Sequence, residues 1–411
     1  MDDTFLAPTP DNSDRFLRKR DEIVTAAAAQ IARRGLKGLT LVGVAQMVGL
    51  NTTSITYYFK RKELLASAAM EDALARFAAI LSPEAAPKAD PRAYLGAALA
   101  RNSAYCAAIR RGEAAPLTIL SDMRALDEPD RTRLIAAYFR LVAQVATRFG
   151  PAADPDQKAR NIARAQLFCD MLHWSRSWLE LYAEADFPRV EARLRDLLSH
   201  GFARPGAPWT PEVFPVDPEG PEPVAISADT YLRIATRLIN ERGYRGASVE
   251  RIVAQLQVSK GSFYHHLSGK DDLVTACFDR SYSRVTATQH RAIALQGDQW
   301  HRLTSALASL LEVQFAGHLP LLRDTAMLAL PPDIRPHVTR RSDRLARRFA
   351  GMISDGIAEG SVRAVDPTIA AQCLMGMVNS AADMAPRVSR WPSRAAAIRD
   401  YAGPLAYGFF D

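Results

Sequence analysis

An internal repeat at an offset of 208 residues constrains the fold of this chain more than any other feature. The two copies align over the compared segments without a gap, and the matching positions include two pairs of glycines. The identical residues are Ala27 and Ala235, Ile31 and Ile239, Arg34 and Arg242, Gly35 and Gly243, Gly38 and Gly246, Ser54 and Ser262, Lys62 and Lys270, and Leu65 and Leu273. Glycines, apolar positions and helix caps are what a shared fold retains, so the pattern predicts one folding unit present twice. A length of 411 residues is sufficient for two or three domains.

The boundary between the copies is a proline-rich segment. Seven prolines lie from Pro205 to Pro223. Because proline lacks an amide hydrogen and fixes φ, this segment excludes a helix, and we expect an extended, semi-rigid linker over residues 205–226. Elsewhere Ala, Leu and Arg at helical spacing dominate, and alternating patterns typical of strands are scarce. The chain is therefore expected to be all-α.

Composition excludes several classes of protein. No apolar stretch approaches the ~18 to 20 residues that a membrane helix requires, and the acidic, polar N-terminus lacks the pattern of a secretory signal. The cysteines are scattered without CxxC spacing, which argues against a disulfide framework or a zinc site and favours a reducing cytosol. The formal charge of +7 and the pI of about 9.3 are compatible with a nucleic-acid partner. We expect a cytoplasmic protein without a membrane partner.

Each copy contains the pattern of a helix-turn-helix. In the first copy, Thr40 and Asn51 precede short helical stretches as N-caps, and Gly49 permits a tight turn between them. In the second copy, Ser248 and Ser259 are the equivalent caps. Helices are expected over residues 15–34, 41–47 and 52–59 and over 231–242, 249–256 and 260–267, each set followed by a further helix from residue 62 or 270. Two short helices joined by such a turn form a motif whose second helix enters the major groove of DNA.

The segments GLNTTSITYYFKRKELL (residues 49–65) and QVSKGSFYHHLSGKDDL (residues 257–273) resemble the DNA-reading segment of the tetracycline-repressor-like (TetR) family of bacterial regulators. The family pattern is a turn ending in Gly-Val, a capped recognition helix, an aromatic residue with His or Tyr and Phe, then Lys and Leu. The resemblance implies an all-α fold of two tandem TetR-like protomers. Each would have a three-helix helix-turn-helix DNA-binding domain and a helical effector and dimerisation domain.

The resemblance also implies DNA contacts by position. The base-edge contacts are Thr52, Thr53 and Thr56 of the first copy and Lys260, Gly261 and Tyr264 of the second. The phosphate contacts are Thr40, Tyr57, Tyr58 and Lys62 with Ser248, His265, His266 and Lys270, and Ser54 and Ser262 complete the DNA-binding set. Lysine at a helix start, together with aromatic hydroxyls and imidazoles, anchors phosphates and sets register. Lysine also donates to guanine in the major groove.

Two positions depart from the family pattern. Thr56 stands where the family usually has tyrosine, so we expect the first copy to recognise fewer bases. Gln257 replaces the usual glycine of the turn, so we expect a slight distortion of the second turn.

Charge separates the two DNA-binding domains, which we call the first reader (residues 15–65) and the second reader (residues 227–273). The first reader carries ten basic and three acidic residues, and the second carries seven and five. We therefore expect the first reader to supply more of the salt-dependent affinity. Four basic residues open it, namely Arg15, Arg18, Lys19 and Arg20. They either reach phosphate or the minor groove or form a solvated helix face.

A stripe of large apolar residues is a candidate effector site in the first copy. Trp174 and Trp178 are spaced i, i+4 and share a stretch with Phe168 and Met171. Such a stripe either lines a ligand cavity or, more commonly, belongs to the core or to a helix-packing surface. A small effector bound there would be partly apolar.

Other chemistry is not expected. His265 and His266 have no third ligand at suitable spacing, so we expect no metal, and no cofactor motif is present. Cys169 and Cys373 are interpreted as buried small apolar residues rather than as a redox switch. The sequence contains no evident Ser-His-Asp arrangement, phosphate loop or paired carboxylates, so an enzyme is not expected.

The expected domain organisation follows from the repeat. It comprises a disordered segment (1–14), the first reader (15–65), a first helical effector and pairing domain (66–204), the linker (205–226), the second reader (227–273) and a second helical domain (274–411). In the family the last two helices of each protomer pack against a partner. Here the candidates are residues 156–182 with 187–202 and residues 367–384 with 394–410.

The resemblance predicts a ligand-responsive transcriptional regulator, a repressor released from double-stranded operator DNA by a small molecule. One alternative is a ligand-insensitive architectural or nucleoid DNA-binding protein, and another is a helical lipid-binding protein with decayed readers. The two copies are expected to pair within one chain. The competing arrangement is a homodimer of fused chains with four readers on a two-fold symmetric site.

Overall fold

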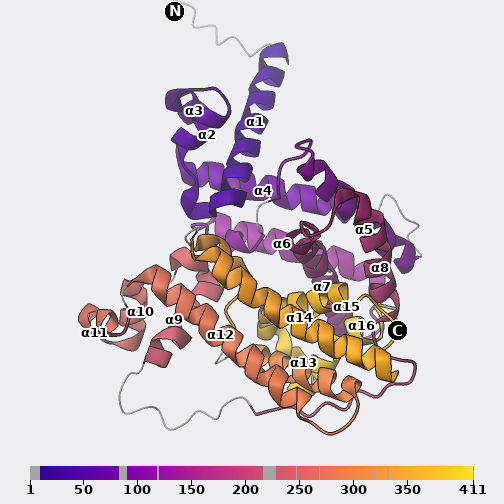
Figure 1. The fold of residues 1–411 in the computed structure, drawn as a ribbon. Coiled ribbons are helices and arrows are strands. Elements are labelled where there is room, and N and C mark those ends of the chain that lie inside the picture. The colour runs from indigo at the N-terminus through magenta and orange to yellow at the C-terminus, as the bar shows by residue number, and fades with distance from the viewer. Residues whose placement is uncertain are drawn as a thin grey trace, which may run out of the picture. The chain divides into compact units, whose positions relative to one another are not determined.

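The computed structural model describes residues 10–82, 90–117, 120–215, 228–246, 248–267, 269–317, 320–330 and 333–410. Over these ranges the chain is helical without strands, which confirms the all-α fold class, and an isolated bridge joins Ala203 to Val362. The first half contains α1 (Pro10–Arg34), α2 (Leu41–Met47), α3 (Thr52–Tyr58), α4 (Lys62–Ile80), α5 (Pro91–Arg110), α6 (Asp130–Ala146), α7 (Pro155–Leu179) and α8 (Phe187–His200). The second contains α9 (Ala228–Gly246), α10 (Val249–Leu256), α11 (Lys260–His266), α12 (Lys270–Ile293), α13 (Gln299–Ala316), α14 (Arg335–Glu359), α15 (Pro367–Met384) and α16 (Arg394–Tyr407) (Figure 1).

The two halves of the chain have the same order of helices. In each half, three reader helices are followed by a long helix and then by the helical domain. Helices α3 and α11 are both 7 residues long, and α8 and α16 are both 14 residues long. The recognition helices and the last helices of the two halves therefore have equal lengths.

The start of α1 differs from the expectation. Helix α1 begins at Pro10, so the prediction of a disordered segment over residues 1–14 is wrong for its last part, and residues 1–9 lie outside the described residues. Proline fits the first turn of a helix because its missing N–H has no intrahelical partner there. Asp14 adds negative charge near the positive end of the helix dipole.

The chain divides into two compact units. The smaller unit comprises Met1–Ala79 and Ala108–Tyr138 and contains the first reader. Within it α2 packs against α1 and α3, and Arg133 forms a 2.8 Å ion pair with Glu71 of α4. The larger unit comprises Ile80–Ala107 and Phe139–Asp411 and contains the second reader and the closing helices of both halves.

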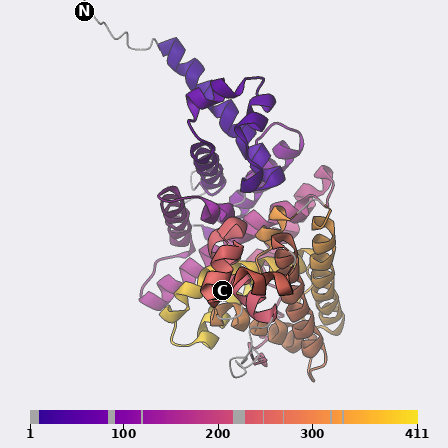
Figure 2. The same cartoon turned by 90° about the vertical axis from the view of Figure 1, so that its left-hand side faces the viewer.

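In the larger unit, the closing helices of the two halves pack against each other. Helices α7 and α8 both contact α15 and α16, as the two views in Figures 1 and 2 indicate. The approach is close, because a Cβ on Gly376 of α15 would lie 2.9 Å from the Trp174 ring of α7. Arg193 of α8 forms an ion pair with Asp366, the N-cap of α15. The closing helices of the two halves thus contact each other within the chain.

Backbone hydrogen bonds join the ends of α8 and α16. The amide of Phe202 donates to the carbonyl of Ala406 at 3.0 Å, and the amide of Phe409 donates to the carbonyl of Leu198 at 2.9 Å. Each bond runs from the residue after one closing helix into the last turn of the other. One carbonyl in the last turn of each helix, which lacks an intrahelical partner, is thus satisfied across the contact.

Two glycines make this contact possible. Gly201 and Gly408 follow α8 and α16 with φ of 65° and 112°. A Cβ on Gly201 would overlap the carbonyl oxygen of Ala406, and a Cβ on Gly408 would lie 2.5 Å from the carbonyl oxygen of Ser199. The two contacts are reciprocal, because residues 201 and 199 are related to 408 and 406 by the same offset of 207. Reciprocal contacts of this kind are the mark of a two-fold related interface.

The first part of the expected linker is docked on the second half. It is non-helical, as expected, and the Phe214 side chain is buried. Hydrogen bonds run from the amide of Glu212 to Ser305 Oγ, from the amide of Phe214 to Ser309 Oγ and from Trp300 Nε1 to the carbonyl of Pro208, at 2.9, 2.9 and 2.8 Å. Residues 205–215 therefore lie along α13, and the rest of the linker (216–227) lies outside the described residues.

Replacing Gly201 with alanine is expected to lower the free energy of unfolding by about 3 kcal/mol, because backbone strain adds to the overlap with Ala406. Gly206 is the matched control, since its φ is 76° but nothing lies within 4 Å of a Cβ there. Gly206→Ala should cost only about 1 kcal/mol. Urea denaturation of both variants measures the difference, and equal losses would show that the α8–α16 contact tolerates a side chain.

Candidate nucleic-acid interface

The first reader has the capped geometry predicted from its sequence. Thr40 Oγ1 accepts a hydrogen bond from the amide of Gly43 at 3.1 Å, and Asn51 Oδ1 accepts one from the amide of Ser54 at 2.7 Å. Helix α4 begins at Lys62, as expected. The caps fix the starts of α2 and α3 because each satisfies an amide that has no intrahelical partner.

The second reader repeats these caps. Ser248 Oγ accepts from the amide of Arg251 at 3.3 Å, and Ser259 Oγ accepts from the amide of Ser262 at 3.2 Å. Helix α12 begins at Lys270. All four predicted caps are therefore confirmed.

The residue at the turn between the two short helices has a left-handed φ in both readers. Gly49 has φ of 65° and Gln257 has φ of 55°, both in the left-handed region. The expected distortion of the second turn is not seen. The sequence change is instead accommodated by placing a glutamine in a conformation that favours glycine, at a cost of about 1 kcal/mol. Among the described non-glycine residues, Gln257 alone has a positive φ.

The predicted contacts of the first reader lie on and beside α3. Ile55 is buried and anchors the helix, which leaves the opposite face toward solvent. Of the predicted set, Thr40, Thr53 and Tyr57 are exposed, and Thr52, Ser54, Thr56, Tyr58 and Lys62 are half-buried. Thr56 Oγ1 donates to the carbonyl of Thr53 at 2.8 Å, so its hydroxyl already has a partner within the helix.

An aromatic cluster that the sequence did not indicate supports this face. The ring of Phe16 in α1 stacks on Tyr58 with centroids 4.8 Å apart, and Tyr57 packs edge-on against Tyr58 at 5.3 Å. Tyr57 remains 76% exposed. The cluster restricts the rotamers of two predicted phosphate contacts, which lowers the entropy that they lose on binding.

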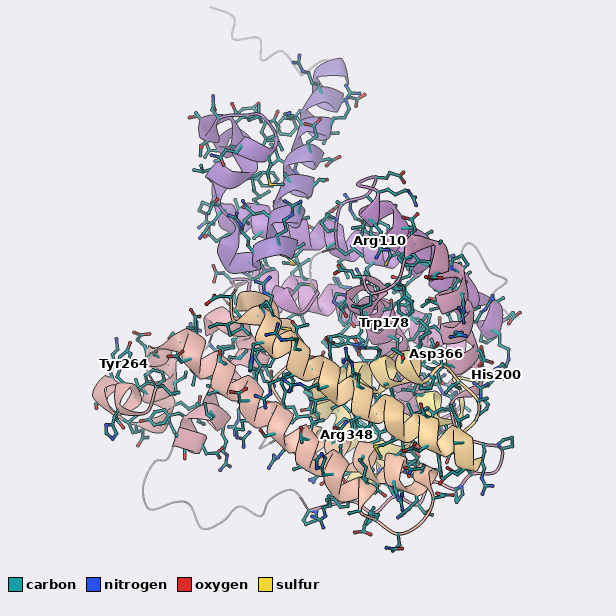
Figure 3. The ribbon with its side chains drawn as sticks, in the orientation of Figure 1. Arg110, Trp178, His200, Tyr264, Arg348 and Asp366 are labelled. Atoms are coloured by element: carbon teal, nitrogen blue, oxygen red, sulfur yellow. The ribbon has the colours of Figure 1, made fainter. Side chains whose placement is uncertain are left out.

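The second reader presents a different face. Lys260, Gly261, Tyr264 and His265 are exposed, Ser248, Ser262 and Lys270 are half-buried, and the His266 side chain lies outside the described residues. Tyr264 projects from α11, as its label in Figure 3 indicates. The Ser262 hydroxyl hydrogen-bonds the hydroxyl of the fully buried Tyr231 at 2.7 Å. Ser262 is therefore directed toward α9 rather than toward a solvent-facing ligand.

The predicted base contact Lys260 forms an ion pair. Its Nζ lies 2.7 Å from Glu250 Oε1 in the first turn of α10, and both side chains are well exposed. The hydrogen bond from Lys260 lowers the pKa of Glu250 to about 2, so the carboxylate is ionised at any physiological pH. Glu250 is a residue of this surface that the sequence reasoning did not select.

Buried polar contacts link the second reader to the helical domain. Asn240 of α9 donates through Nδ2 to the carbonyl of Leu321 at 2.8 Å and accepts from the amide of Arg323 at 3.1 Å. The amide of Leu322 donates to Ser281 Oγ of α12 at 2.9 Å. The segment before the short helix Asp324–Ala329 is thus held by two helices at successive residues.

Asp324 extends this network to the pairing helix. Tyr282 of α12 donates through its hydroxyl to Asp324 Oδ1 at 3.0 Å, and Asn379 of α15 donates through Nδ2 to Oδ2 at 2.6 Å. Burial raises the pKa of Asp324 to about 6, although both hydrogen bonds oppose the rise. A continuous set of polar contacts therefore runs from α9 of the reader to α15 of the inter-half contact.

The candidate effector residues lie in packed surroundings. Phe168 is fully buried, with its ring 6.3 Å from Tyr94 and 6.1 Å from Phe409 of the second half. Met171 and Trp174 lie against Gly376. The stripe thus contributes to the contact between the halves, and its role in binding an effector stays a prediction.

The described residues contain no group of three or more His, Cys, Asp or Glu side chains arranged to hold a metal ion. No helix in the described ranges has both the length and the apolar character needed to cross a membrane.

Comparisons with known proteins agree with the reader geometry. Residues 232–277 match the family model of bacterial regulatory proteins of the tetR family. Residues 296–383 match the model of the tetracyclin repressor-like C-terminal domain. The second half of the chain is therefore similar to members of the TetR family. The matched segments contain the helix-turn-helix of the second half and most of the helical domain that follows it.

Individual relatives cover only parts of the chain. The Transposon Tn10 TetC protein of Escherichia coli is 36% identical over 50 residues, which is 12% of this chain and 25% of that protein. The HTH-type transcriptional regulator BetI of Paraburkholderia phymatum is 36% identical over 85 residues, 20% of this chain and 43% of its own length. The chain thus spans less than half the length of these relatives. A solved structure of the TetR-family regulator PfmR from Thermus thermophilus has 22% identity and a TM-score of 0.37 over 43% of this chain and 97% of its own.

Exchanging the residues at the two turn positions should stabilise the second turn and destabilise the first. Gln257→Gly relieves left-handed strain and should stabilise the second turn by roughly 0.5–1 kcal/mol, after allowance for glycine's larger entropy loss. The reciprocal Gly49→Gln should destabilise the first turn by a similar amount. Amide hydrogen exchange in α10 and α11, and in α2 and α3, measures each effect. Faster exchange in Gln257→Gly would show that Gln257 makes a compensating contact.

Asp324→Asn should change the pH dependence of stability. The pKa of Asp324 is raised from its ordinary value of 3.8 to about 6 in the folded chain, so folding favours the protonated form. The protonated Asp324 carboxyl makes its full contribution to the free energy of unfolding below about pH 4. This contribution, roughly 3 kcal/mol at most, is lost as the pH rises through 6. The stability of the variant relative to the unmodified chain should therefore increase between pH 4 and 7. Parallel profiles in urea denaturation would mean that Asp324 titrates normally.

Proposed function

We propose that the chain is a ligand-responsive DNA-binding transcriptional regulator of the bacterial cytosol. It would act as a repressor that a small, partly apolar effector releases from double-stranded operator DNA. The two halves would pair within one chain to form a pseudo-dimer. The observation that carries this proposal is the reciprocal contact between the ends of α8 and α16, combined with a capped helix-turn-helix in each half.

The capped recognition helices support sequence-specific binding. Exposed hydroxyl and ammonium groups occupy the positions from which a recognition helix contacts base edges. Lysines at the starts of α4 and α12 are placed by the family pattern against phosphates, which set register without reading sequence. A protein that recognises DNA by shape alone needs charge but not these helices, so this favours a regulator over an architectural protein.

The contact between the halves supports a single-chain assembly. Helices α7 and α8 occupy the surfaces of α15 and α16 that a second chain would otherwise cover. Fusion raises the local concentration of the partner half to about the millimolar range. The remaining linker, 216–227, needs to reach only α9, because residues 205–215 are already docked on α13.

The contacts of Asn240 and Asp324 support allosteric control. The segment 321–324 contacts α9 of the second reader on one side and α15 on the other. An effector that shifts α15 or the helices around it would change the support of α9. Linkage requires that DNA weakens effector binding by the same factor by which the effector weakens DNA binding.

The two readers would bind unlike half-sites. The first presents Thr52, Thr53 and Thr56, and the second presents Lys260, Gly261 and Tyr264. Because the side chains differ at each equivalent position, one chain has no use for a symmetric operator.

Selection of sites from random duplex DNA by the full-length chain tests the function. We expect one chain per site and two dissimilar half-sites about one helical turn, ~34–36 Å, apart. Lys62→Ala and Lys270→Ala should each weaken binding to all sequences and reduce the salt slope by about one unit. Solution mass and footprint length measure the stoichiometry. Two chains on a perfect palindrome would refute the pseudo-dimer, and equal affinity for the selected site and bulk DNA would favour the architectural protein.

A further inference from the structure

The ion pair between Glu250 and Lys260 joins the N-terminal ends of α10 and α11 in the second reader. Glu250 lies in the first turn of α10, and Lys260 is the first residue of α11. Their charged atoms are 2.7 Å apart, and the side chains are 62% and 58% exposed. Exposed ion pairs contribute little to stability because solvent screens them. The pair is therefore poorly explained as a device that holds the reader together.

The first reader has no such pair. At the same offset of 208, Val42 replaces Glu250 and Thr52 replaces Lys260. Val42 is 55% exposed, so it is not needed there as core. Both readers share caps, turn conformation and helix lengths, and a carboxylate and an ammonium have been placed together at this surface in one reader only.

We propose that Glu250 is a specificity-determining residue of the second reader, which lowers attraction to DNA of any sequence by occupying Lys260 and favours a G·C pair at its half-site. This inference rests on the proposed function as a DNA-binding regulator. It adds a residue and a base preference that the family resemblance does not supply.

The preference for a G·C pair follows from which DNA groups can hydrogen-bond Lys260 and Glu250 once their ion pair is broken. A phosphate can accept a hydrogen bond from Lys260, but it leaves the Glu250 carboxylate unpaired beside another negative charge. In the major groove, guanine offers N7 and O6 as acceptors, and its paired cytosine offers N4 as a donor. A G·C pair can therefore satisfy the ammonium and the carboxylate together, while phosphate satisfies only the ammonium.

The pair also explains the charge difference between the readers in functional terms. Sequence-independent affinity depends on the number of phosphates neutralised, with a slope of about 0.9 per phosphate in a plot of log K against log salt. A lysine held by a glutamate adds no net charge to the surface. The second reader would thus depend more on base contacts than the first, which carries more net positive charge.

Glu250→Gln in the full-length chain tests the proposal, because it removes the carboxylate charge and keeps the shape. Binding is measured by salt titration on the site selected by the unmodified chain and on duplex DNA of equal length without it. We expect affinity for the unrelated DNA to rise about fivefold and its salt slope to steepen by about 0.9. Affinity for the selected site should change less than twofold. Selection with the variant should also lose the G·C preference in one half-site only.

Two further variants test whether the effect of Glu250→Gln comes from the loss of charge alone or from the loss of its contact with Lys260. Glu241→Gln removes an equal charge from an exposed position of α9, while the ion pair of Lys260 is with Glu250, and should leave both affinities and the slope unchanged. In a Lys260→Ala background, Glu250→Gln should lose most of its effect.

The outcomes are distinguishable. If the unmodified chain binds no selected site, the proposed function fails and this inference fails with it. If it binds its site and Glu250→Gln behaves like Glu241→Gln, only the role of Glu250 is overturned. A full gain that persists without Lys260 would also overturn it, because Glu250 would then act by repelling phosphate directly.

Discussion

The packing of α7 and α8 against α15 and α16 is the interaction on which the rest of the larger unit depends. Apolar burial drives it, but its geometry is set by small residues that let the backbone approach. Gly376 admits the Trp174 ring, and Gly201 and Gly408 admit carbonyl oxygens of the opposite helix. Because each glycine lies against a rigid group, the register of the helices is fixed at three separate points. Burial alone would allow these helices to slide.

The fold was largely predictable from the sequence because its signals are local. The repeat, the caps at Thr40, Asn51, Ser248 and Ser259 and the lysines that open α4 and α12 depend on short-range geometry, which the sequence records directly. The bounds of the closing helices were also close to those expected, since helical periodicity and flanking Pro or Gly mark them. The start of α1 was misjudged because polar residues at a helix start resemble those of an unstructured tail.

The candidate site was less predictable where it depends on tertiary contacts. The partner of Lys260 lies ten residues away on another helix, so no spacing rule singles out Glu250. Asp324 is one of many acidic residues in the sequence, and only the fold places it between Tyr282 and Asn379. The docking of residues 205–215 on α13 was equally hidden, because proline excludes a helix without saying what the extended chain contacts. The contact of Phe16 with Tyr58 was hidden for the same reason, because the two rings are far apart in the sequence and meet only in the folded chain.

The four closing helices belong to one polypeptide, namely α7, α8, α15 and α16. This affects how their assembly depends on protein concentration. When two separate chains must meet before they act, the assembled fraction falls with dilution, and at low abundance most molecules are single and inactive. Contacts between segments of the same chain form in a first-order process, so the assembled fraction does not depend on how many copies a cell holds. Dilution therefore does not separate α7 and α8 from α15 and α16.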